Sequence, residues 1–140
     1  MRFWDSSAVV PLLCREKQTA PMIRIYAADM DMLVWGFAQT EILSALCRKA
    51  RDGALPRNGF DEAISRLEAL KSDWTENIDY EGVRERAARL LAIHPLSAAD
   101  ALQLAAALVA VEERTRGFEF VTLDDRLAQA ATREGFAVML

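Results

Sequence analysis

Residues 95–111, PLSAADALQLAAALVAV, constrain the fold more than any other stretch of the chain. Between residues 101 and 111 the only polar side chain is that of Gln103. A helix that is apolar on every side is buried inside a protein, and this one is too short to span a membrane, which needs roughly 20 apolar residues. The pattern therefore predicts a central buried helix that the rest of the chain covers.

The first turn of this helix carries an acid, Asp100, three residues after a candidate N-cap at Ser97. A carboxylate at the mouth of a buried helix needs a hydrogen bond, a cation or a metal ion. One interpretation is that Asp100 only completes a capping box with Ser97. The other acids of the chain bear on that choice.

Composition limits the classes of function. The 140 residues fit one domain, residues 1–140, and the net charge of -4 gives no overall attraction to nucleic acid. Cys14 and Cys47 lie alone in apolar helical patterns, so we expect two buried thiols rather than a disulfide or a zinc site. Asp5 interrupts any apolar leader at the N-terminus. We therefore expect a cytoplasmic protein with no membrane segment.

Strands alternate with helices along the chain, which predicts an α/β domain with a mainly parallel sheet. The expected strands are residues 2–5, 33–38, 74–78, 118–123 and 136–140. The other expected helices are residues 8–17, 23–28, 41–51, 58–70, 81–93 and 125–134. In such a sheet, ligands bind outside the carboxyl ends of the strands.

Four acids belong at that edge: Asp5, Glu41, Asp100 and Asp124. Each follows a strand or opens a helix, so each alone could be a helix cap. As a set they lack counter-charges, since Arg2 is the only basic residue within five positions of Asp5 or Asp100. Clustered carboxylates without a cation have raised pKa values and cost stability, and a hard divalent cation removes that penalty. The set therefore favours a shared Mg²⁺ or Mn²⁺ site over four independent caps.

Other chemistries lack their residues. His94 is the only histidine, which excludes a ribonuclease mechanism that needs two, and we expect it at a surface or a helix end. There is no GxSxG, P-loop or dinucleotide fingerprint. A phosphoaspartate enzyme needs a second aspartate two residues after the first, but position 7 is serine. A receiver domain needs a lysine near the end of a late strand, but no lysine follows Lys71.

With these residues in place, the chain resembles the PIN-domain nucleases, and most closely the VapC ribonuclease toxins of bacterial toxin–antitoxin pairs. The matching segments are RFWDSSAVVPLL, FAQTEILSAL, LSAADALQLAAALV and FVTLDDRLAQAATREGFAV, which together run from one end of the chain to the other. The resemblance implies a three-layer α/β/α domain with strand order 3-2-1-4-5. It also implies Mg²⁺- or Mn²⁺-dependent RNA cleavage, a homodimer, and a cognate VapB-like antitoxin that blocks the acidic pocket.

The resemblance assigns roles to individual residues. Asp5 and Asp100 match the principal metal-binding acids of the family, and Asp124 matches the acid of its T-x-D segment. Glu41 matches the acid near the start of the helix after the second strand, and Ser7 the small hydroxyl residue near the first acid.

Two positions depart from the family pattern. Trp4 is bulkier than the usual aliphatic residue before the first acid, which concerns packing rather than chemistry. Asp125 directly follows Asp124, so the fourth acid could be shifted by one position.

The resulting hypothesis is that Asp5, Asp100 and Asp124 hold one or two metal ions, with Glu41 as a ligand or as the residue that orients water. Hydrolysis would then leave 5′-phosphate and 3′-hydroxyl ends. An antitoxin segment would insert an arginine among the acids and pack in an apolar groove beside residues 58–70 and 81–93. The candidate contacts to the RNA backbone are Arg48, Lys49, Arg51 and Arg126.

Two alternatives remain open at this point. One is a PIN-domain nuclease of general RNA processing that has no antitoxin. The other is a catalytically inactive PIN module that acts only by binding a partner.

Overall fold

A five-stranded parallel sheet forms the middle layer of the structure, a computed structural model that describes residues 1–140. Its strands lie in the order β3-β2-β1-β4-β5, and every neighbouring pair is parallel. The predicted α/β class and strand order are confirmed. The strands are β1 (Arg2–Trp4), β2 (Met32–Trp35), β3 (Thr75–Asn77), β4 (Glu119–Val121) and β5 (Ala137–Met139).

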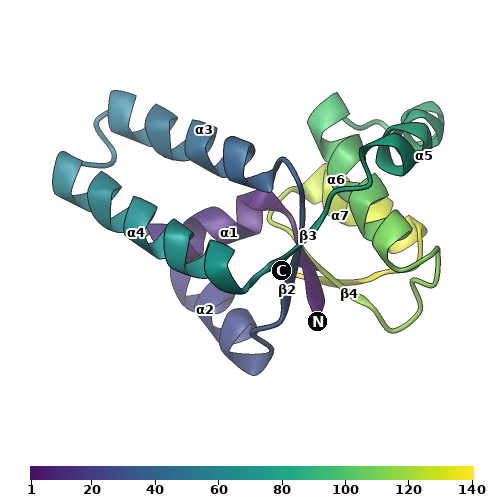
Figure 1. The fold of residues 1–140 in the computed structure, drawn as a ribbon, viewed down its shortest axis with the longest axis horizontal. Helices are drawn as coiled ribbons and strands as arrows, with labels where there is room; N and C mark the ends of the chain where they lie inside the picture. The colour runs from purple at the N-terminus through teal and green to yellow at the C-terminus, as the bar shows by residue number, and fades with distance from the viewer.

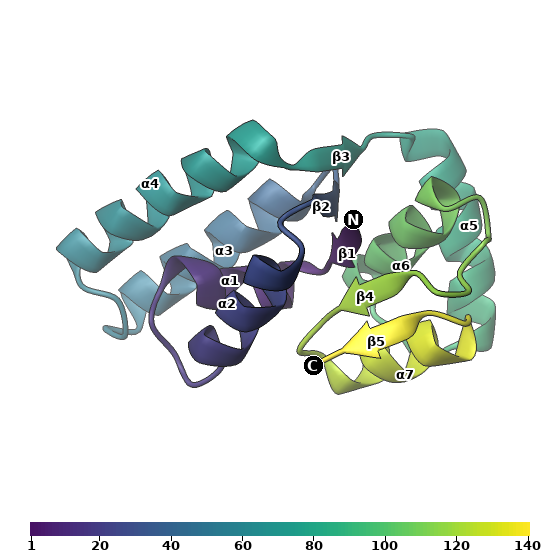
Figure 2. The same cartoon turned by 90° about the horizontal axis from the view of Figure 1, so that it is seen from below.

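Helices cover the sheet on both sides (Figures 1 and 2). One side carries α1 (Ser6–Leu13), α2 (Thr19–Ala28), α3 (Ala38–Arg51) and α4 (Arg57–Asp73). The other carries α5 (Tyr80–Ile93), α6 (Ala98–Ala110) and α7 (Asp125–Arg133). Each side has its own apolar core against the sheet, of 17 buried residues under α5–α7 and 16 under α1–α4.

The helix predicted at residues 95–111 is α6, and it is buried as its sequence requires. Every residue from 103 to 108 is at most 1 % exposed. All four residues of β2 are buried too, as expected for a parallel strand covered on both faces. These two elements fix the middle of the molecule, because α6 packs directly on β2.

Several boundaries differ from the prediction. The second strand ends at Trp35 rather than at residue 38, and α3 begins at Ala38 rather than at residue 41. The first helix ends at Leu13 rather than at residue 17, and α2 begins at Thr19 rather than at residue 23. Side-chain hydrogen bonds explain the break, because the Thr19 hydroxyl donates to the Cys14 carbonyl at 3.1 Å and accepts from the Glu16 amide at 2.9 Å. Such local bonds compete with helix continuation.

One expected surface is wrong. The groove predicted beside residues 58–70 and 81–93 does not form, because these residues lie in α4 and α5, at opposite ends of the molecule (Figure 1). Helix α4 packs against α1 and α3, whereas α5 packs against α6. By length and composition no single helix qualifies to cross a membrane; only α5 and α6 taken together, with a bend of 119° between them, pass that test.

Candidate active site

The carboxyl ends of the strands bring distant residues to one edge of the sheet. Asp5 directly follows β1, and its backbone N–H donates to the carbonyl of Val121 at the end of β4, at 2.9 Å. Glu41 lies in the first turn of α3, after β2, and Asp100 in the first turn of α6. Asp124 precedes α7, after β4. All four acids predicted from the sequence therefore lie near one edge.

Asp5 is the most deeply buried of the four, at 4 % exposure. One carboxylate oxygen, Oδ2, accepts hydrogen bonds from the hydroxyls of Ser7 and Thr122, the latter at 2.8 Å. These hydroxyls in turn accept the backbone N–H groups of Leu123 at 3.0 Å and Asp124 at 3.1 Å. The start of α1 and the loop after β4 are thus joined through the first acid.

The Glu41 carboxylate receives a hydrogen bond from a residue of the central helix. Gln103 Nε2 donates to Glu41 Oε1 at 3.1 Å and to the hydroxyl of Ser6 at 2.8 Å. Burial raises the pKa of Glu41 to about 7, the charges of Asp5 and Asp100 add to that rise, and the Gln103 hydrogen bond opposes it.

The capping interpretation holds for some of the acids and fails for others. Ser97 caps α6 by accepting the N–H of Asp100 at 3.2 Å, which is one half of the capping box expected there. Asp5 occupies the N-cap position of α1 but makes no capping bond with its side chain. Asp124 does cap its helix, because Oδ1 accepts the N–H of Leu127 at 2.8 Å.

No cation neutralises this group of acids. None of the ion pairs in the structure involves any of the four carboxylates. Arg2, the nearest basic residue in sequence, pairs with Glu119 and donates to the carbonyl of Ile25 instead. The acids are therefore left to interact with one another.

Their pKa values reflect that interaction. Burial raises the pKa of Asp5, hydrogen bonds from Ser7 and Thr122 oppose the rise, and the charge of Asp100 adds to it. Burial also raises the pKa of Asp100; Ser97 opposes this and the charge of Asp124 reinforces it. Asp124 therefore lies close enough to Asp100 for their charges to interact, as expected for the fourth acid of the group.

The donor chemistry of this group fits a hard divalent cation, since it offers only oxygen ligands with uncompensated, partly dehydrated charge. The carboxylates do not form a closed cage, because no three acidic, histidine or cysteine side chains are arranged to hold a metal ion as they stand. Mg²⁺ is usually held by one or two carboxylates and keeps several waters, so an open arrangement of this kind suits it.

The basic residues expected to contact RNA divide into two kinds. Lys49 forms an ion pair with Glu16 at 2.7 Å, which makes it the least available of the four candidates. The side chains of Arg48, Arg51 and Arg126 are exposed and form no ion pair. These three candidates are free to contact a phosphate backbone.

His94 is buried, at 6 % exposure, and forms the C-cap of α5. Its Nε2 lies 2.7 Å from Glu134 Oε1, and Arg86 reaches both Glu134 and Glu113. The expected helix-end position is confirmed, and the surface alternative is wrong. This network ties the ends of α5 and α7 together.

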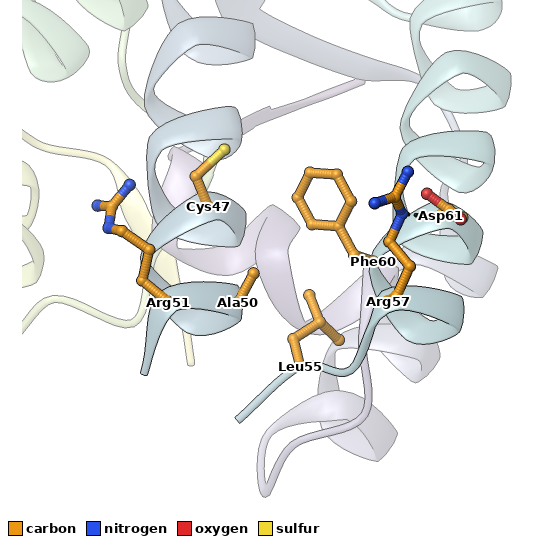
Figure 3. A pocket seen from close by; sticks show the side chains of 7 residues that line it. All are labelled: Cys47, Ala50, Arg51, Leu55, Arg57, Phe60 and Asp61. Atoms are coloured by element: carbon orange, nitrogen blue, oxygen red, sulfur yellow. Dashed lines mark ion pairs between the residues drawn. The ribbon is translucent and has the colours of Figure 1, made fainter. Parts of the chain in front are cut away.

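A hollow of about 610 Å³ lies between the end of α3 and the start of α4 (Figure 3). Its one acid, Asp61, already pairs with Arg57 at 3.5 Å, so the hollow lacks the free carboxylates of a hydrolytic site. Cys47 lines it and is half-buried, which corrects the expectation of a fully buried thiol. The residues that line it are Cys47, Ala50, Arg51, Leu55, Arg57, Phe60 and Asp61.

Comparisons with known proteins agree with this geometry. The family model described as "PIN domain" matches residues 2–133. The chain belongs to the PIN-domain family. It is also 32% identical, over 126 residues, to the protein named Ribonuclease VapC3 from two strains of Mycobacterium tuberculosis, CDC 1551 / Oshkosh and ATCC 25618 / H37Rv. The match covers 90% of this chain and 84% of the relative, which places this PIN domain with the VapC proteins.

Two residues of the PIN domain's site went without a role in the sequence analysis. Thr122 was part of the T-x-D segment, but nothing in the pattern showed that its hydroxyl reaches Asp5, 117 positions away. Gln103 is the only polar residue within the apolar helix, and this was the only feature of the sequence that pointed to a role for it. A lone amide on an otherwise apolar helix therefore indicates a specific partner.

The raised pKa values predict how the stability of the metal-free PIN domain depends on pH. A carboxyl group whose pKa is higher in the folded than in the unfolded state stabilises the fold below its unfolded pKa, and this contribution is lost as pH rises through the folded value. For Glu41 the window runs from its ordinary pKa of 4.5 to about 7. We expect the melting temperature in EDTA to fall as pH rises through this window, and to fall less in Glu41→Gln.

Thermal unfolding of both proteins, followed by circular dichroism between those pH values, measures this difference. Taking the difference between the two proteins removes contributions from other titrating groups. Equal pH dependence in both would show that Glu41 does not carry an uncompensated charge in the folded state.

Proposed function

We propose that this PIN domain is a metal-dependent endoribonuclease and the toxin of a type II toxin–antitoxin pair, acting in the cytoplasm. The observation that carries the proposal is the group of four acids without a counter-charge at the carboxyl edge of the sheet. Its relatives named Ribonuclease VapC3 support RNA as the substrate. Nucleases of this family generally use divalent metals, which agrees with the donor chemistry of the group.

In this proposal Asp5, Asp100 and Asp124 hold Mg²⁺, for which Mn²⁺ substitutes. A bound divalent ion lowers the pKa of a coordinated water and offsets the charge that develops on the phosphate. Glu41, with its raised pKa, orients the attacking water or accepts its proton. No protein nucleophile takes part, so the products carry 5′-phosphate and 3′-hydroxyl ends.

Exposed arginines would position the RNA backbone. Arg48 follows Glu41 by seven residues, which places it on the same side of α3 and about 10 Å further along the helix. Arg51 lies one turn beyond, and Arg126 lies in the first turn of α7, two residues after Asp124. Contacts of this kind fix the position of a nucleic acid without selecting its sequence.

The first test of the proposal is metal-dependent cleavage. Purified protein should cleave RNA in the presence of Mg²⁺ or Mn²⁺ and stop in EDTA, because the acids alone cannot neutralise the phosphate. Gel analysis of end-labelled RNA, with and without phosphatase treatment, identifies the ends. Cleavage that continues in EDTA, or products with a 2′,3′-cyclic phosphate, would contradict the mechanism. An absence of cleavage under every metal condition would favour an inactive binding module.

Asp100 and Ser97 offer a matched pair of variants that separates catalysis from capping. Ser97→Ala removes the cap of α6 and should cost about 1 kcal/mol of unfolding free energy while retaining most of the cleavage activity, because the Asp100 carboxylate remains. Asp100→Asn removes a repelled charge, so it should abolish cleavage and leave the fold as stable or more stable.

Urea unfolding and RNA cleavage by both variants give the comparison. An active Asp100→Asn protein would limit Asp100 to a structural role.

We also propose that the chain forms a homodimer, as the family resemblance implies. Apolar side chains that remain exposed support a protein interface near the acids. Phe37 is 50 % exposed, Ile78 is 60 % and Tyr80 is 42 %, and the Phe37 and Tyr80 rings lie 5.3 Å apart. Exposed apolar groups of this kind are typical of interaction surfaces.

The antitoxin would use two features of the surface. The acids that attract a divalent cation also attract a guanidinium, which binds carboxylates in fork geometry. An apolar depression of about 250 Å³ lies among α1, α2 and α4, and Leu12 and Leu70 are two of its lining residues. Because α1 begins next to Asp5, roughly 10 Å of helix separates the acids from this depression. A short antitoxin segment spans that distance.

An arginine of the antitoxin should therefore control inhibition. In the native complex, replacing that arginine by alanine should restore nuclease activity, while replacing arginines at the rim should not. On this chain, Leu70→Glu should weaken antitoxin binding by about 10-fold or more, because a charge would enter the apolar depression. Leu91→Glu, on exposed α5, is the matched control and should leave binding unchanged.

Calorimetric titration of the toxin variants with the antitoxin measures both effects. If no arginine replacement restores activity, the antitoxin does not block the acids with a guanidinium.

A further inference from the structure

Gln103 places an amide where the rest of the central helix is apolar. It lies in α6, three residues after Asp100, and its side chain is fully buried. The neighbouring residues on both sides, Leu102 and Leu104, are apolar. A side chain of leucine or methionine would suit this environment better, so the amide needs a reason other than packing.

Both hydrogens of this amide are used, and both are directed to the acidic site. One is donated to Ser6, the residue after Asp5, at 2.8 Å. The other is donated to the Glu41 carboxylate at 3.1 Å. The amide therefore connects α6, α1 and α3 at the point where three of the four acids meet.

The other end of the amide has no partner. Gln103 Oε1 is buried and accepts no hydrogen bond. A buried acceptor without a partner destabilises a fold, because the group has lost its hydration without compensation. Gln103 is consequently unfavourable for the stability of the fold. This indicates that the residue serves the two hydrogen bonds that its Nε2 donates.

Glu41 depends on this amide for its position. The Glu41 carboxylate has no ion pair, and the only side chain that donates a hydrogen bond to it is Gln103. Asp5 and Asp100 repel it, since their charges raise its pKa. A glutamate has three rotatable bonds, so without a donor that repulsion would turn its carboxylate away from the other acids.

We propose that Gln103 is a positioning residue of the nuclease site, whose buried amide, anchored on Ser6, holds the Glu41 carboxylate among the other acids. This inference rests on the proposed function, because it assigns Gln103 to catalysis through Glu41. It makes no claim of contact between Gln103 and the RNA.

The contact itself is tested by NMR spectroscopy, independently of any activity. The side-chain amide signals of Gln103 are assigned by their loss in Gln103→Met. Their hydrogens should exchange with solvent much more slowly than those of the exposed Gln129, and their chemical shifts should move in Glu41→Ala. Fast exchange, or shifts unaffected by Glu41→Ala, would overturn the proposal even if the protein cleaves RNA.

The catalytic consequence is tested with Gln103→Met, which keeps the length of the side chain and removes both donors. We expect kcat for RNA cleavage to fall by about 10- to 100-fold, with KM within about twofold of the wild-type value. The unfolding free energy should change little, because the removal of an unpartnered acceptor offsets the loss of the two hydrogen bonds. Leu108→Met, five residues further along α6 and also buried, is the matched control and should retain full activity.

Combination with Glu41→Gln separates positioning from a general loss of structure. Measured under single-turnover conditions, Gln103→Met should lower the rate in the wild-type protein but have little further effect in Glu41→Gln. An unchanged kcat, a loss of stability that accompanies the loss of rate, or additive effects of the two changes would each overturn the proposal. If the wild-type protein cleaves no RNA, the proposed function fails, and the NMR result still decides whether Gln103 holds Glu41.

Discussion

The acidic site is shaped by electrostatic repulsion among carboxylates that form no ion pair with a basic side chain. Burial and mutual charge raise the pKa values of Asp5, Glu41 and Asp100. The acids stay together because a rigid sheet and a buried helix hold their backbones at one edge. The apolar character of α6 matters here, since a mobile helix would let Asp100 move away from the group. The packing of the apolar core thus offsets the electrostatic repulsion among the acids.

The hydrogen bonds inside the site come from neutral donors. Ser7 and Thr122 donate to Asp5, and Gln103 donates to Glu41. An arginine or lysine in those positions would stabilise the carboxylates further but would also neutralise them. Neutral donors orient the acids and leave their charge to be neutralised from outside the chain. The same uncompensated charge would attract both the proposed metal ion and the proposed antitoxin arginine, which would then compete for one pocket.

Local patterns predicted the elements, and the geometry of parallel sheets predicted where the acids gather. The apolar run of α6 and the acids after β1 and β4 sufficed for that, because strand ends in a parallel sheet share an edge. Contacts between residues distant in sequence could not be predicted, because local patterns do not show which side chains meet. Gln103 and Ser6, for example, are 97 positions apart. Nor could the sequence separate Arg48 from Lys49, since neighbours on a helix face different surroundings, and only Lys49 meets Glu16.

The choice between cap and ligand, which the sequence left open for each acid, has no single answer in the structure. Asp124 caps α7 with Oδ1, and its Oδ2 makes no hydrogen bond. Asp5 accepts both hydroxyl hydrogen bonds with Oδ2, and no hydroxyl donates to its Oδ1. A carboxylate has two oxygens, so one can fix the residue in the fold while the other serves a cation. Capping and metal binding are for this reason compatible roles of one carboxylate. An acid at a helix start after a parallel strand can cap the helix and still bind a metal ion.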